Sequence, residues 1–536
     1  LGIGASDVSF GWALEAHANG AVQSAYQLRL GTLAGEGDIW SPERVRSGRQ
    51  VDVRLPDRIR LAPATRYFWQ VKTWDGGGDE SAWSEPAWFE TGLLNESDWR
   101  GAEWIGRSIE EPEPWSDFKT AVEFTLENEA LGVFLRASAD GREACMWQIN
   151  VTGKNPVLRT HRKKDGNYQV LADTDLTKHG FTNDSIRNGK HTLVFDVFGS
   201  TITTKLDGKE IDRFSGDIPR RGFIGLRTYG NERARIHRIK ASNSKGSALL
   251  AEDHGDAGLT VSGGSEAILT GNPVSLPLLR GEFHAKKPVT SARVYASARG
   301  IYELTCNGGK VGNQRLAPGW TDYHQRIQAQ TYDITAMVKP GANVLGAALA
   351  DGWYRGKVGL GWTKAYGEQT AFVAKIRLTY DDGTTEWFST NRSWRADGGP
   401  FLTGDLQDGE TYDARREQAG WDTPEFDASR WKPVTVLAND SAKLVPQPDD
   451  PVRETEVLTA KSMTTPAPGT HVYDLGQNMV GVTRIRLTGR KGQTATIRHA
   501  EELHRSGERK GQLYTDNFRS AKVTDRYTFA EDGSVV

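Results

Sequence analysis

An alternation of apolar and polar residues with a period of two is the feature of this chain that most limits its possible folds. It is clear in residues 25–30 (AYQLRL) and 65–74 (TRYFWQVKTW), and it returns at 193–197, 201–206 and 484–487. Successive side chains of a strand point to opposite faces of a sheet, so this period is typical of half-buried strands. No window of about 12 residues or more carries the i, i+3, i+4, i+7 apolar stripe of an amphipathic helix. The sequence therefore predicts an all-β fold.

Composition agrees with strands and argues against several classes of partner. The chain has 536 residues, with 17 Trp, 15 Tyr and 18 Phe but only 4 Met, a balance that favours sheets. Its 67 Lys and Arg face 69 Asp and Glu, which gives a net charge of −2 and no basic surface for a nucleic-acid backbone. No apolar run approaches the roughly 18 residues of a membrane-spanning helix. We therefore expect no nucleic-acid partner and no membrane partner.

The cysteines do not indicate a cellular compartment. Cys145 and Cys306 are the only two, and they lie far apart in the sequence. They form neither a disulfide framework nor the spacing of a zinc ribbon. The sequence leaves localisation open between secretion and the cytoplasm.

Turns and weakly patterned stretches divide the chain into four predicted units. Residues 1–93 predict a small sandwich of short strands, and 105–247 predict a second sandwich of jelly-roll or lectin type. A Gly- and Ser-rich stretch near 250–274 is interpreted as a linker. Residues 275–440 form the third unit and 441–536 the fourth. We expect a multidomain protein built of β-sandwiches.

The end of the chain predicts a hairpin whose second strand is cut short. Residues 523–529 alternate like a strand, 531–534 form a turn, and Val535 begins a return strand that has no room to continue. A strand without a partner exposes an unpaired edge. We therefore interpret the fourth unit as an incomplete sandwich and expect the natural chain to continue past Val536.

Motifs for catalysis are missing. The sequence contains no phosphate-binding loop, dinucleotide-binding glycine motif or serine-hydrolase elbow. His499 and His504 are five residues apart on a predicted strand, whereas a helical zinc motif needs a spacing of four. The pairs Asp381–Asp382 and Asp449–Asp450 fit turns, and Cys145 is typical of a small core residue. We assign no catalytic residue in this segment.

Residue types in the second unit favour a carbohydrate-binding face. Sugar sites combine aromatic rings with the amide, carboxylate and guanidinium groups that bond hydroxyls. Arg136 and Ser138 share one face of a predicted strand, and Met146, Gln148 and Asn150 share one face of another. Any half-exposed antiparallel strand also carries polar residues, so an ordinary solvent-facing sheet stays open as the alternative. The candidate carbohydrate-binding residues are Arg136, Asp140, Trp147, Gln148 and Arg227.

Longer strings in the other units resemble a known family. Residues 317–323 (APGWTDY), 349–356 (LADGWYRG) and 409–415 (GETYDAR) resemble the N-terminal jelly roll of bacterial α-L-rhamnosidases, glycoside hydrolase family 78. Residues 474–481 (DLGQNMVG) resemble the start of that family's concanavalin-like β-sandwich, and 81–92 resemble the fibronectin-III-like domain before it. The resemblance implies hydrolysis of terminal α-L-rhamnosides with inversion, which uses one carboxylic acid and one carboxylate.

The same resemblance implies that the catalytic groups lie elsewhere. In the family they belong to an (α/α)6 barrel that follows the β-domains, and this chain has no such helical segment. It would then be the non-catalytic front part of a rhamnosidase and inactive by itself, with the C-terminal barrel of the same protein as its partner. Its ligands would be rhamnose-containing glycosides or polysaccharides, and hydrolysis would require no cofactor.

The second unit is inserted relative to the family pattern. Strings like 103–106 (EWIG) and 277–283 (PLLRGEF) usually follow each other closely, but here a long segment separates them. Within it, 136–138 (RAS) and 146–148 (MWQ) resemble a rhamnose-binding module of some actinobacterial rhamnosidases. That module depends on calcium, with a loop Asp and Asn among its ligands, whereas the loop here reads DGRE at 140–143. The resemblance implies a structural calcium as a hypothesis and leaves its ligands unknown.

Two functions of other classes stay open. One is a stand-alone carbohydrate-binding protein without catalysis, against which the shortened final hairpin argues. The other is a lyase acting on rhamnosyl-glucuronate linkages, because some such lyases have a similar domain layout. The gene beyond Val536 would separate them: a stop codon favours the first, and a barrel with an eliminating Tyr or His favours the second.

Overall fold

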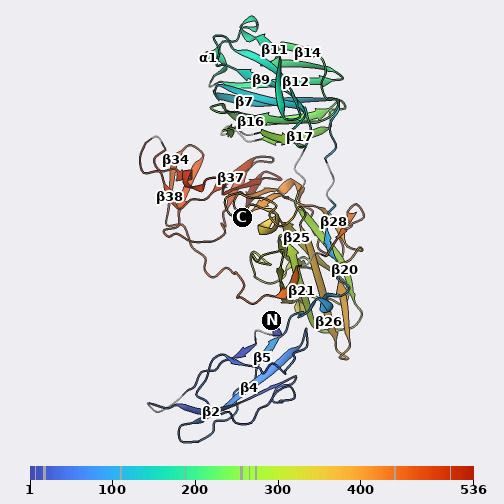
Figure 1. Ribbon diagram of the computed structural model, residues 1–536, viewed down its shortest axis with the longest axis vertical. Coiled ribbons are helices and arrows are strands. Elements are labelled where there is room, and N and C mark those ends of the chain that lie inside the picture. The colour runs from blue at the N-terminus through green and yellow to red at the C-terminus, as the bar shows by residue number, and fades with distance from the viewer. Residues whose placement is uncertain are drawn as a thin grey trace. The chain divides into compact units, whose positions relative to one another are not determined.

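Strands dominate the computed structural model of the chain (Figure 1). The two α-helices of the described part are single turns, α1 (Asn183–Ile186) and α2 (Gly352–Arg355), and none is long and apolar enough to cross a membrane. The fold is all-β and multidomain, which confirms the prediction from the two-residue period. The structure describes residues 1–5, 8–15, 20–108, 112–187, 189–253, 258–264, 266–271, 275–439, 442–507 and 509–536.

Contacts divide the chain into two compact units. Unit 1 consists of Leu1–Ile109 and Ser275–Val536, and unit 2 consists of Glu110–Val274. Unit 2 is therefore inserted into unit 1, as the family pattern predicts. Each unit has its own hydrophobic clusters, so each can be described by itself.

Unit 1 begins with a small sandwich. Its larger sheet has the antiparallel order β2-β4-β5, and a two-stranded pair, β1-β3, accompanies it. Alternating residues such as Leu28, Tyr67 and Phe89 are buried in its core, because the period of two puts them on one face. The strands are β1 (Ser9–Phe10), β2 (Gln23–Gly31), β3 (Val53–Arg54), β4 (Arg66–Asp75) and β5 (Ala87–Glu90).

The centre of unit 1 is a jelly roll made of two sheets. One has the order β23-β22-β25-β20-β28-β31, and the other β32-β6-β26-β21-β24-β33, with β27 on β26. Ile105, expected at the start of the inserted unit, instead pairs with Phe372 in this jelly roll. The strands are β6 (Trp104–Gly106), β20 (Pro277–Ala285), β21 (Val289–Arg299), β22 (Ile301–Cys306), β23 (Gly309–Lys310), β24 (Arg326–Asp333), β25 (Gly341–Ala350), β26 (Ala371–Tyr380), β27 (Thr385–Ser389), β28 (Arg395–Gly398), β31 (Lys432–Pro433), β32 (Thr435–Leu437) and β33 (Lys443–Pro446).

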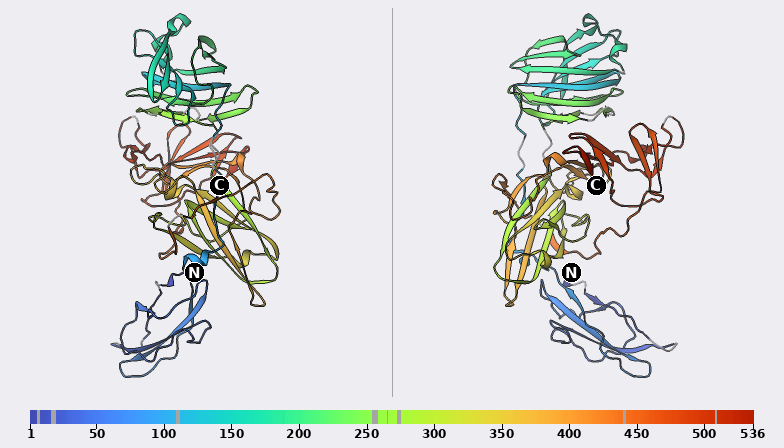
Figure 2. Two further views of the ribbon diagram at one scale, coloured as in Figure 1. Left: turned by 45° about the vertical axis from the view of Figure 1, so that its right-hand side comes forward. Right: turned by 180° about the vertical axis from the view of Figure 1, so that it is seen from behind.

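The last part of unit 1 has short strands and little core. Figure 2 shows it, in orange to red, mostly as irregular chain with short arrows, and of the described residues in 455–536 only Thr524, Thr528 and Phe529 are buried. The expectation that Val535 has no partner is wrong, because it pairs with Leu487. The strands are β29 (Phe401–Asp405), β30 (Gly409–Asp413), β34 (Ser462–Ala467), β35 (Thr470–Asp474), β36 (Leu487–Gly489), β37 (Thr494–Arg498), β38 (Glu502–Leu503), β39 (Leu513–Tyr514), β40 (Thr524–Thr528) and β41 (Gly533–Val535).

Unit 2 is a sandwich of two antiparallel sheets. The six-stranded sheet has the order β11-β10-β9-β8-β15-β19, and the other has the order β14-β13-β12-β7-β16-β17, with β18 on β16. The strands are β7 (Phe118–Asn128), β8 (Ala130–Ala137), β9 (Ala144–Asn150), β10 (Val157–Lys164), β11 (Asn167–Asp175), β12 (Lys190–Phe198), β13 (Thr201–Leu206), β14 (Lys209–Ser215), β15 (Phe223–Arg227), β16 (Arg233–Asn243), β17 (Ala248–Asp253), β18 (Leu259–Ser262) and β19 (Glu266–Leu269).

The expectation of a linker near 250–274 is wrong for the residues that form β17, β18 and β19. β17 and β18 pair with β16, and β19 pairs with β15. Leu250 on β17 is fully buried in the core of unit 2. Short strands separated by Gly and Ser carry too little periodicity to be recognised in the sequence, and only pairing with long strands stabilises them.

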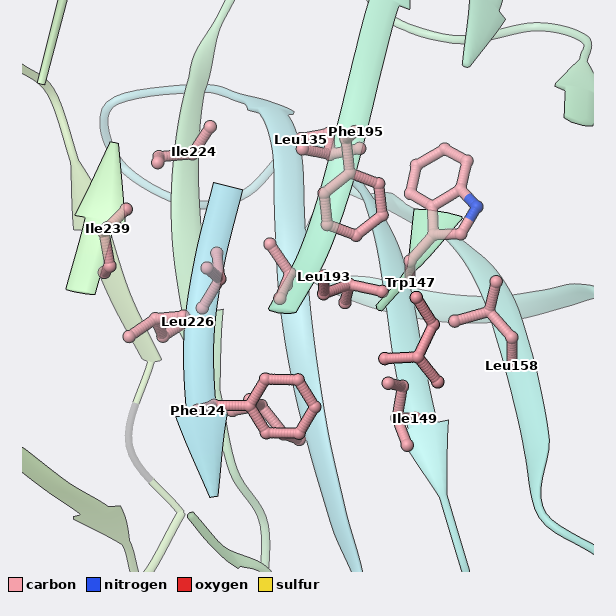
Figure 3. Close-up of a cluster of buried hydrophobic side chains, with 14 of the residues drawn as sticks. Phe124, Leu135, Trp147, Ile149, Leu158, Leu193, Phe195, Ile224, Leu226 and Ile239 are labelled. Atoms are coloured by element: carbon pink, nitrogen blue, oxygen red, sulfur yellow. The ribbon is translucent and has the colours of Figure 1, made fainter. Parts of the chain in front are cut away.

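The core between the two sheets of unit 2 holds Trp147. Figure 3 shows its indole near Phe195, within a cluster of buried hydrophobic side chains. Its ring centroid lies 6.1 Å from that of Phe195 and 5.8 Å from that of Phe214. The indole nitrogen donates to Asp212 Oδ2 at 3.2 Å, which satisfies the one polar atom of the buried ring. Trp147 is therefore part of the core.

Candidate functional site

The burial of Trp147 fixes which residues of β9 face away from the core. Neighbouring positions on a strand point to opposite sides, so Gln148 lies on the face of the six-stranded sheet that is turned away from the other sheet. We call it the outer face. The register places Arg159 of β10 and Gly132 of β8 on either side of Gln148, and Arg227 of β15 beyond Gly132. Two of the predicted site residues thus belong to one row across the sheet.

Glu232, which follows β15, brings Gln148 and Arg227 together. Gln148 Nε2 donates to Glu232 Oε1 at 2.8 Å, and Arg227 lies 3.2 Å from both carboxylate oxygens. The backbone N–H of Tyr229 donates to Oε2 at 2.8 Å. Burial raises the pKa of Glu232, although Arg227 opposes that effect. The result is a nearly buried carboxylate whose position three donors determine.

Two tyrosine rings flank Arg227. Its guanidinium carbon lies 5.4 Å from the ring centroid of Tyr168 and 5.2 Å from that of Tyr229, within the range of cation–π attraction. Tyr229 is 68% exposed. The Tyr168 hydroxyl donates to Glu266, and burial, followed by that bond, raises its pKa. The hydrogen bond to Glu266 therefore holds the ring of Tyr168 beside the charged groups.

Lys163 and Glu266 form another ion pair on the outer face. Lys163 Nζ lies 2.5 Å from Glu266 Oε2, and it also lies over the rings of Phe134 and Tyr168, at 5.4 and 5.0 Å. Burial tends to raise the pKa of Glu266, but the hydrogen bonds from Lys163 and Tyr168 outweigh it and the pKa is lowered. Glu266 is thus held as a carboxylate.

His161 is a nearly buried side chain with an unused ring nitrogen. Its ring packs edge-on against Tyr168 with centroids 6.0 Å apart, and its Nδ1 has no hydrogen-bond partner. Burial, with Arg159 and Arg227 nearby, lowers its pKa to about 4. The imidazole is therefore neutral at pH 7, and its unbonded Nδ1 is buried.

The other three predicted residues lie elsewhere. Trp147 is in the core. Arg136 is almost fully buried and donates to the carbonyl oxygens of Ser116, Gly199 and Pro219, so it ties loops together. Asp140 lies in an exposed turn, where it accepts from Ser138 Oγ at 2.6 Å and from the Arg142 N–H at 3.0 Å.

Several residues of the outer face were missed by sequence reasoning. His161 and Lys163 alternate on β10 with Arg159, and that alternation was the signal that could have placed them on one face. Glu232 carries no such signal, because it lies in a connection and its role depends on the register of β15 against β8 and β9. Within the described ranges, no group of three or more His, Cys, Asp or Glu side chains is placed to hold a metal ion. Calcium can also be bound by backbone and amide carbonyls and by water, so the calcium hypothesis stays a prediction.

Chemically, the outer face can bind a small polar molecule that also has an apolar side. Gln148, Arg227 and Glu232 offer donors and acceptors, and the exposed ring of Tyr229 offers a flat apolar surface. Among the described residues of this face, no pair of carboxylates has one free acid and one free base, since Asp173, Glu232 and Glu266 are each bonded to a cation. Binding is therefore the chemistry that this face supports.

Three family models match the chain. The Rha78A-like, N-terminal immunoglobulin domain matches residues 1–95, the alpha-L-rhamnosidase N-terminal domain matches 287–456, and the bacterial alpha-L-rhamnosidase concanavalin-like domain matches 464–534. Their order along the chain is the order of the sandwiches in unit 1. The first supports an immunoglobulin-like fold for the N-terminal sandwich.

Curated relatives agree with the family models. An alpha-L-rhamnosidase of Streptomyces avermitilis is 36% identical over 570 residues, which covers 99% of this chain and 52% of the relative. One from Alteromonas sp. is 40% identical over 258 residues, 48% of this chain and 28% of the relative. Neither the stand-alone binding protein nor the lyase gains support from these relatives. The chain spans about half the length of the Streptomyces enzyme.

Solved structures lead to the same family. The crystal structure of the Streptomyces avermitilis alpha-L-rhamnosidase complexed with L-rhamnose matches the whole chain with a TM-score of 0.67 and 31% identity, and 53% of that chain is covered. The alpha-L-rhamnosidase from Dictyoglumus thermophilum, at 23% identity, has the same fold with a TM-score of 0.64. With the shared order of domains, these similarities show that residues 1–95, 287–456 and 464–534 are domains of the bacterial α-L-rhamnosidase family.

Proposed function

We propose that this chain is the carbohydrate-binding, non-catalytic front part of an α-L-rhamnosidase that hydrolyses terminal α-L-rhamnosides with inversion. Its partner is the C-terminal catalytic barrel of the same protein. In this proposal the outer face of unit 2 binds the rhamnose-containing glycosides or polysaccharides that are the substrates. Unit 1 is the scaffold on which the barrel is held.

The observation that carries the binding proposal is the meeting of Gln148 and Arg227 at Glu232, beside the exposed ring of Tyr229. Neighbouring sugar hydroxyls need closely spaced donors and acceptors, and a carboxylate between an amide and a guanidinium provides both. A 6-deoxy sugar such as rhamnose also has an apolar edge, formed by its methyl group, that an aromatic ring can cover.

Isothermal titration of the full chain with L-rhamnose tests this site. We expect weak binding, with a Kd near the millimolar range that is usual for one sugar ring on an open face. Tyr229→Ala should weaken it about tenfold, equivalent to about 1.4 kcal/mol, because the ring that covers the sugar is lost. Folding should not suffer, since Tyr229 is largely exposed.

Phe198→Ala is the matched control. Phe198 ends β12 in the other sheet of unit 2 and is 70% exposed, so its loss removes an aromatic ring of similar exposure without touching the outer face. Binding of the Phe198→Ala chain should equal that of the unchanged chain. An absence of heat at protein concentrations near millimolar, or equal losses in both variants, would refute the outer-face site.

Titration with added calcium and with a chelator tests the ion suggested by the family resemblance. The described residues of the outer face bind the sugar in our proposal without a metal, so the heat should be the same in both solutions. Loss of binding on chelation would contradict this assignment of the contacts.

The non-catalytic role is tested with p-nitrophenyl α-L-rhamnoside. Inverting hydrolysis needs an acid and a base about 6.5–9.5 Å apart with room for a water molecule, and we assign no such pair in this chain. The chain should release no nitrophenol above the buffer rate. Turnover at about 1 s⁻¹ or faster, which is enzyme-like, would disprove the proposal.

A further inference from the structure

Two indole rings lie parallel on the central jelly roll of unit 1. Trp320 lies in the connection between β23 and β24, and Trp353 lies on α2. Their planes differ by 5° and their centroids are 6.3 Å apart. Stacked carbon atoms in contact are about 3.5–4 Å apart, so parallel rings whose centres are this far apart are displaced sideways. Part of each indole face is therefore not covered by the other ring.

Buried aromatic residues support these two rings. Tyr323, which follows Trp320 after Thr321 and Asp322, and Tyr354, next to Trp353, are buried and pack edge-on with centroids 5.5 Å apart. Tyr366 packs against both, at 5.1 and 6.5 Å, and its hydroxyl accepts a hydrogen bond from the Trp320 indole nitrogen at 3.3 Å. We call Trp320, Trp353 and Tyr366 the aromatic platform. It is fixed before any ligand arrives, which lowers the entropy cost of binding.

One ring of the platform, Trp320, is exposed, the other two are half-buried, and the surroundings are polar. Trp320 is 55% exposed, although the tyrosines beneath it already form the core. Asp322, His324 and Gln325, which follow it directly, are all exposed. Asp322 accepts from the His324 N–H at 3.1 Å and from Gln325 Nε2 at 2.8 Å, so these groups form a fixed polar border. A flat aromatic surface with a polar border fits a sugar ring better than an apolar protein segment, which needs a continuous apolar patch.

We propose that the aromatic platform is a second carbohydrate-binding site, which stacks a neutral pyranose ring of the glycan. The C–H groups on one side of the pyranose lie on the indole faces, and the hydroxyls at its edge bond the polar border. This site is built entirely from unit 1, and none of its residues belongs to the outer face of unit 2. It therefore does not depend on the site proposed above.

Fluorine NMR of the full chain labelled with 5-fluorotryptophan tests the platform directly. Trp320→Phe and Trp353→Phe identify two of the resonances from the 17 tryptophans. Methyl α-L-rhamnopyranoside is the probe, added up to roughly 50 mM because single sugars bind in the millimolar range. We expect the resonances of Trp320 and Trp353 to shift in a saturable way. The resonance of Trp362, which is 69% exposed on the same jelly roll, should not shift.

Variants separate this site from the outer face. In the Tyr229→Ala chain the shifts of Trp320 and Trp353 should persist even though the heat of rhamnose binding falls. Trp320→Ala should abolish the shift of Trp353, whereas Trp362→Ala should leave it unchanged. If neither platform resonance moves, or if Trp362 moves equally, the platform does not bind this sugar and the inference is overturned, whatever the titration of the outer face shows.

Discussion

A single carboxylate joins two parts of unit 1. Glu90, at the end of β5 in the N-terminal sandwich, receives two hydrogen bonds from Arg293 on β21, at 2.7 and 2.9 Å. Arg66 on β4 donates to the same carboxylate at 2.8 Å. Glu90 and Arg293 are both nearly buried. An ion pair of this kind costs desolvation energy and is most sensitive to the loss of one partner.

Acid should weaken this junction. Burial raises the pKa of Glu90, but the bonds from Arg293 and Arg66 outweigh it, so the pKa in the folded chain is below that of an unfolded carboxyl. The contribution of Glu90 to the free energy of unfolding is therefore fully present above pH ~4.3. It is lost as the pH drops through the pKa of the folded chain. Glu90→Gln should lower the free energy of unfolding by about 3 kcal/mol at pH 7. The difference in Tm between this variant and the unchanged chain should become smaller towards pH 3. Exposed Glu85→Gln is the control, and a gap that is independent of pH would contradict the prediction.

Trp147 gives a second test at the scale of one residue. Because its ring fills the core of unit 2, Trp147→Ala should destabilise that unit by about 3–5 kcal/mol. Trp147→Phe keeps most of the volume and should cost less, while L-rhamnose should still bind in titration. If Trp147→Phe folded normally but lost binding, the indole would be a ligand group and our placement of the site would be wrong.

At the scale of elements, long alternating strands could be predicted from the sequence and short edge strands could not. The run 201–206 is β13 as observed, and 65–74 differs from β4 by one residue at each end. β18 and β19 have four residues each and follow glycines, so their period is too short to detect. The outer face shows the same limit. Gln148 could be named from alternation, but its partner Glu232 depends on strand register, which local sequence does not encode.

Whether residues 248–253 form a strand, β17, or a linker can be tested at Leu250. Leu250 is buried in the core if residues 248–253 form a strand, and it would be exposed in a linker. Leu250→Asp should therefore lower the stability of unit 2 by about 3 kcal/mol or more, since a carboxylate would be buried without a partner. Leu259→Asp, on the more exposed β18, should have a small effect. Equal melting temperatures of the two variants would favour the linker.

The whole molecule consists of a host and an inserted unit with separate cores. The family models match only unit 1, at 1–95, 287–456 and 464–534, whereas the Streptomyces relative covers 99% of the chain. The insertion could be predicted from the sequence. Residues 103–106 and 277–283 resemble stretches that lie close together in the family, but here a long segment outside the family pattern separates them. Their strands, β6 and β20, belong to the two sheets of one jelly roll.

Deletion of unit 2 should therefore leave unit 1 folded. A chain in which a short Gly-Ser linker replaces Glu110–Val274 should keep the melting transition of unit 1, because every described strand in the sheets of unit 1 comes from unit 1 itself. The heat of rhamnose binding assigned to the outer face should disappear, while the fluorine shifts of Trp320 should remain. Calorimetry and titration of this chain check both, and an unfolded unit 1 would show that the two cores are coupled.

The position of β6 also has a consequence for synthesis of the chain. β6 leaves the ribosome before unit 2, but its partner β26 follows much later, and Arg107 just after β6 bonds a residue 262 positions further on. At about 5–20 residues per second, that interval is roughly 13–50 s. During this time unit 2 emerges completely, while β6 still lacks its neighbouring strand β26. Unit 2 must therefore fold during synthesis without help from a completed unit 1. A variant that slows the folding of unit 2 leaves both unit 2 and the jelly roll of unit 1 unfolded, and so exposed to chaperones and proteases, at the same time.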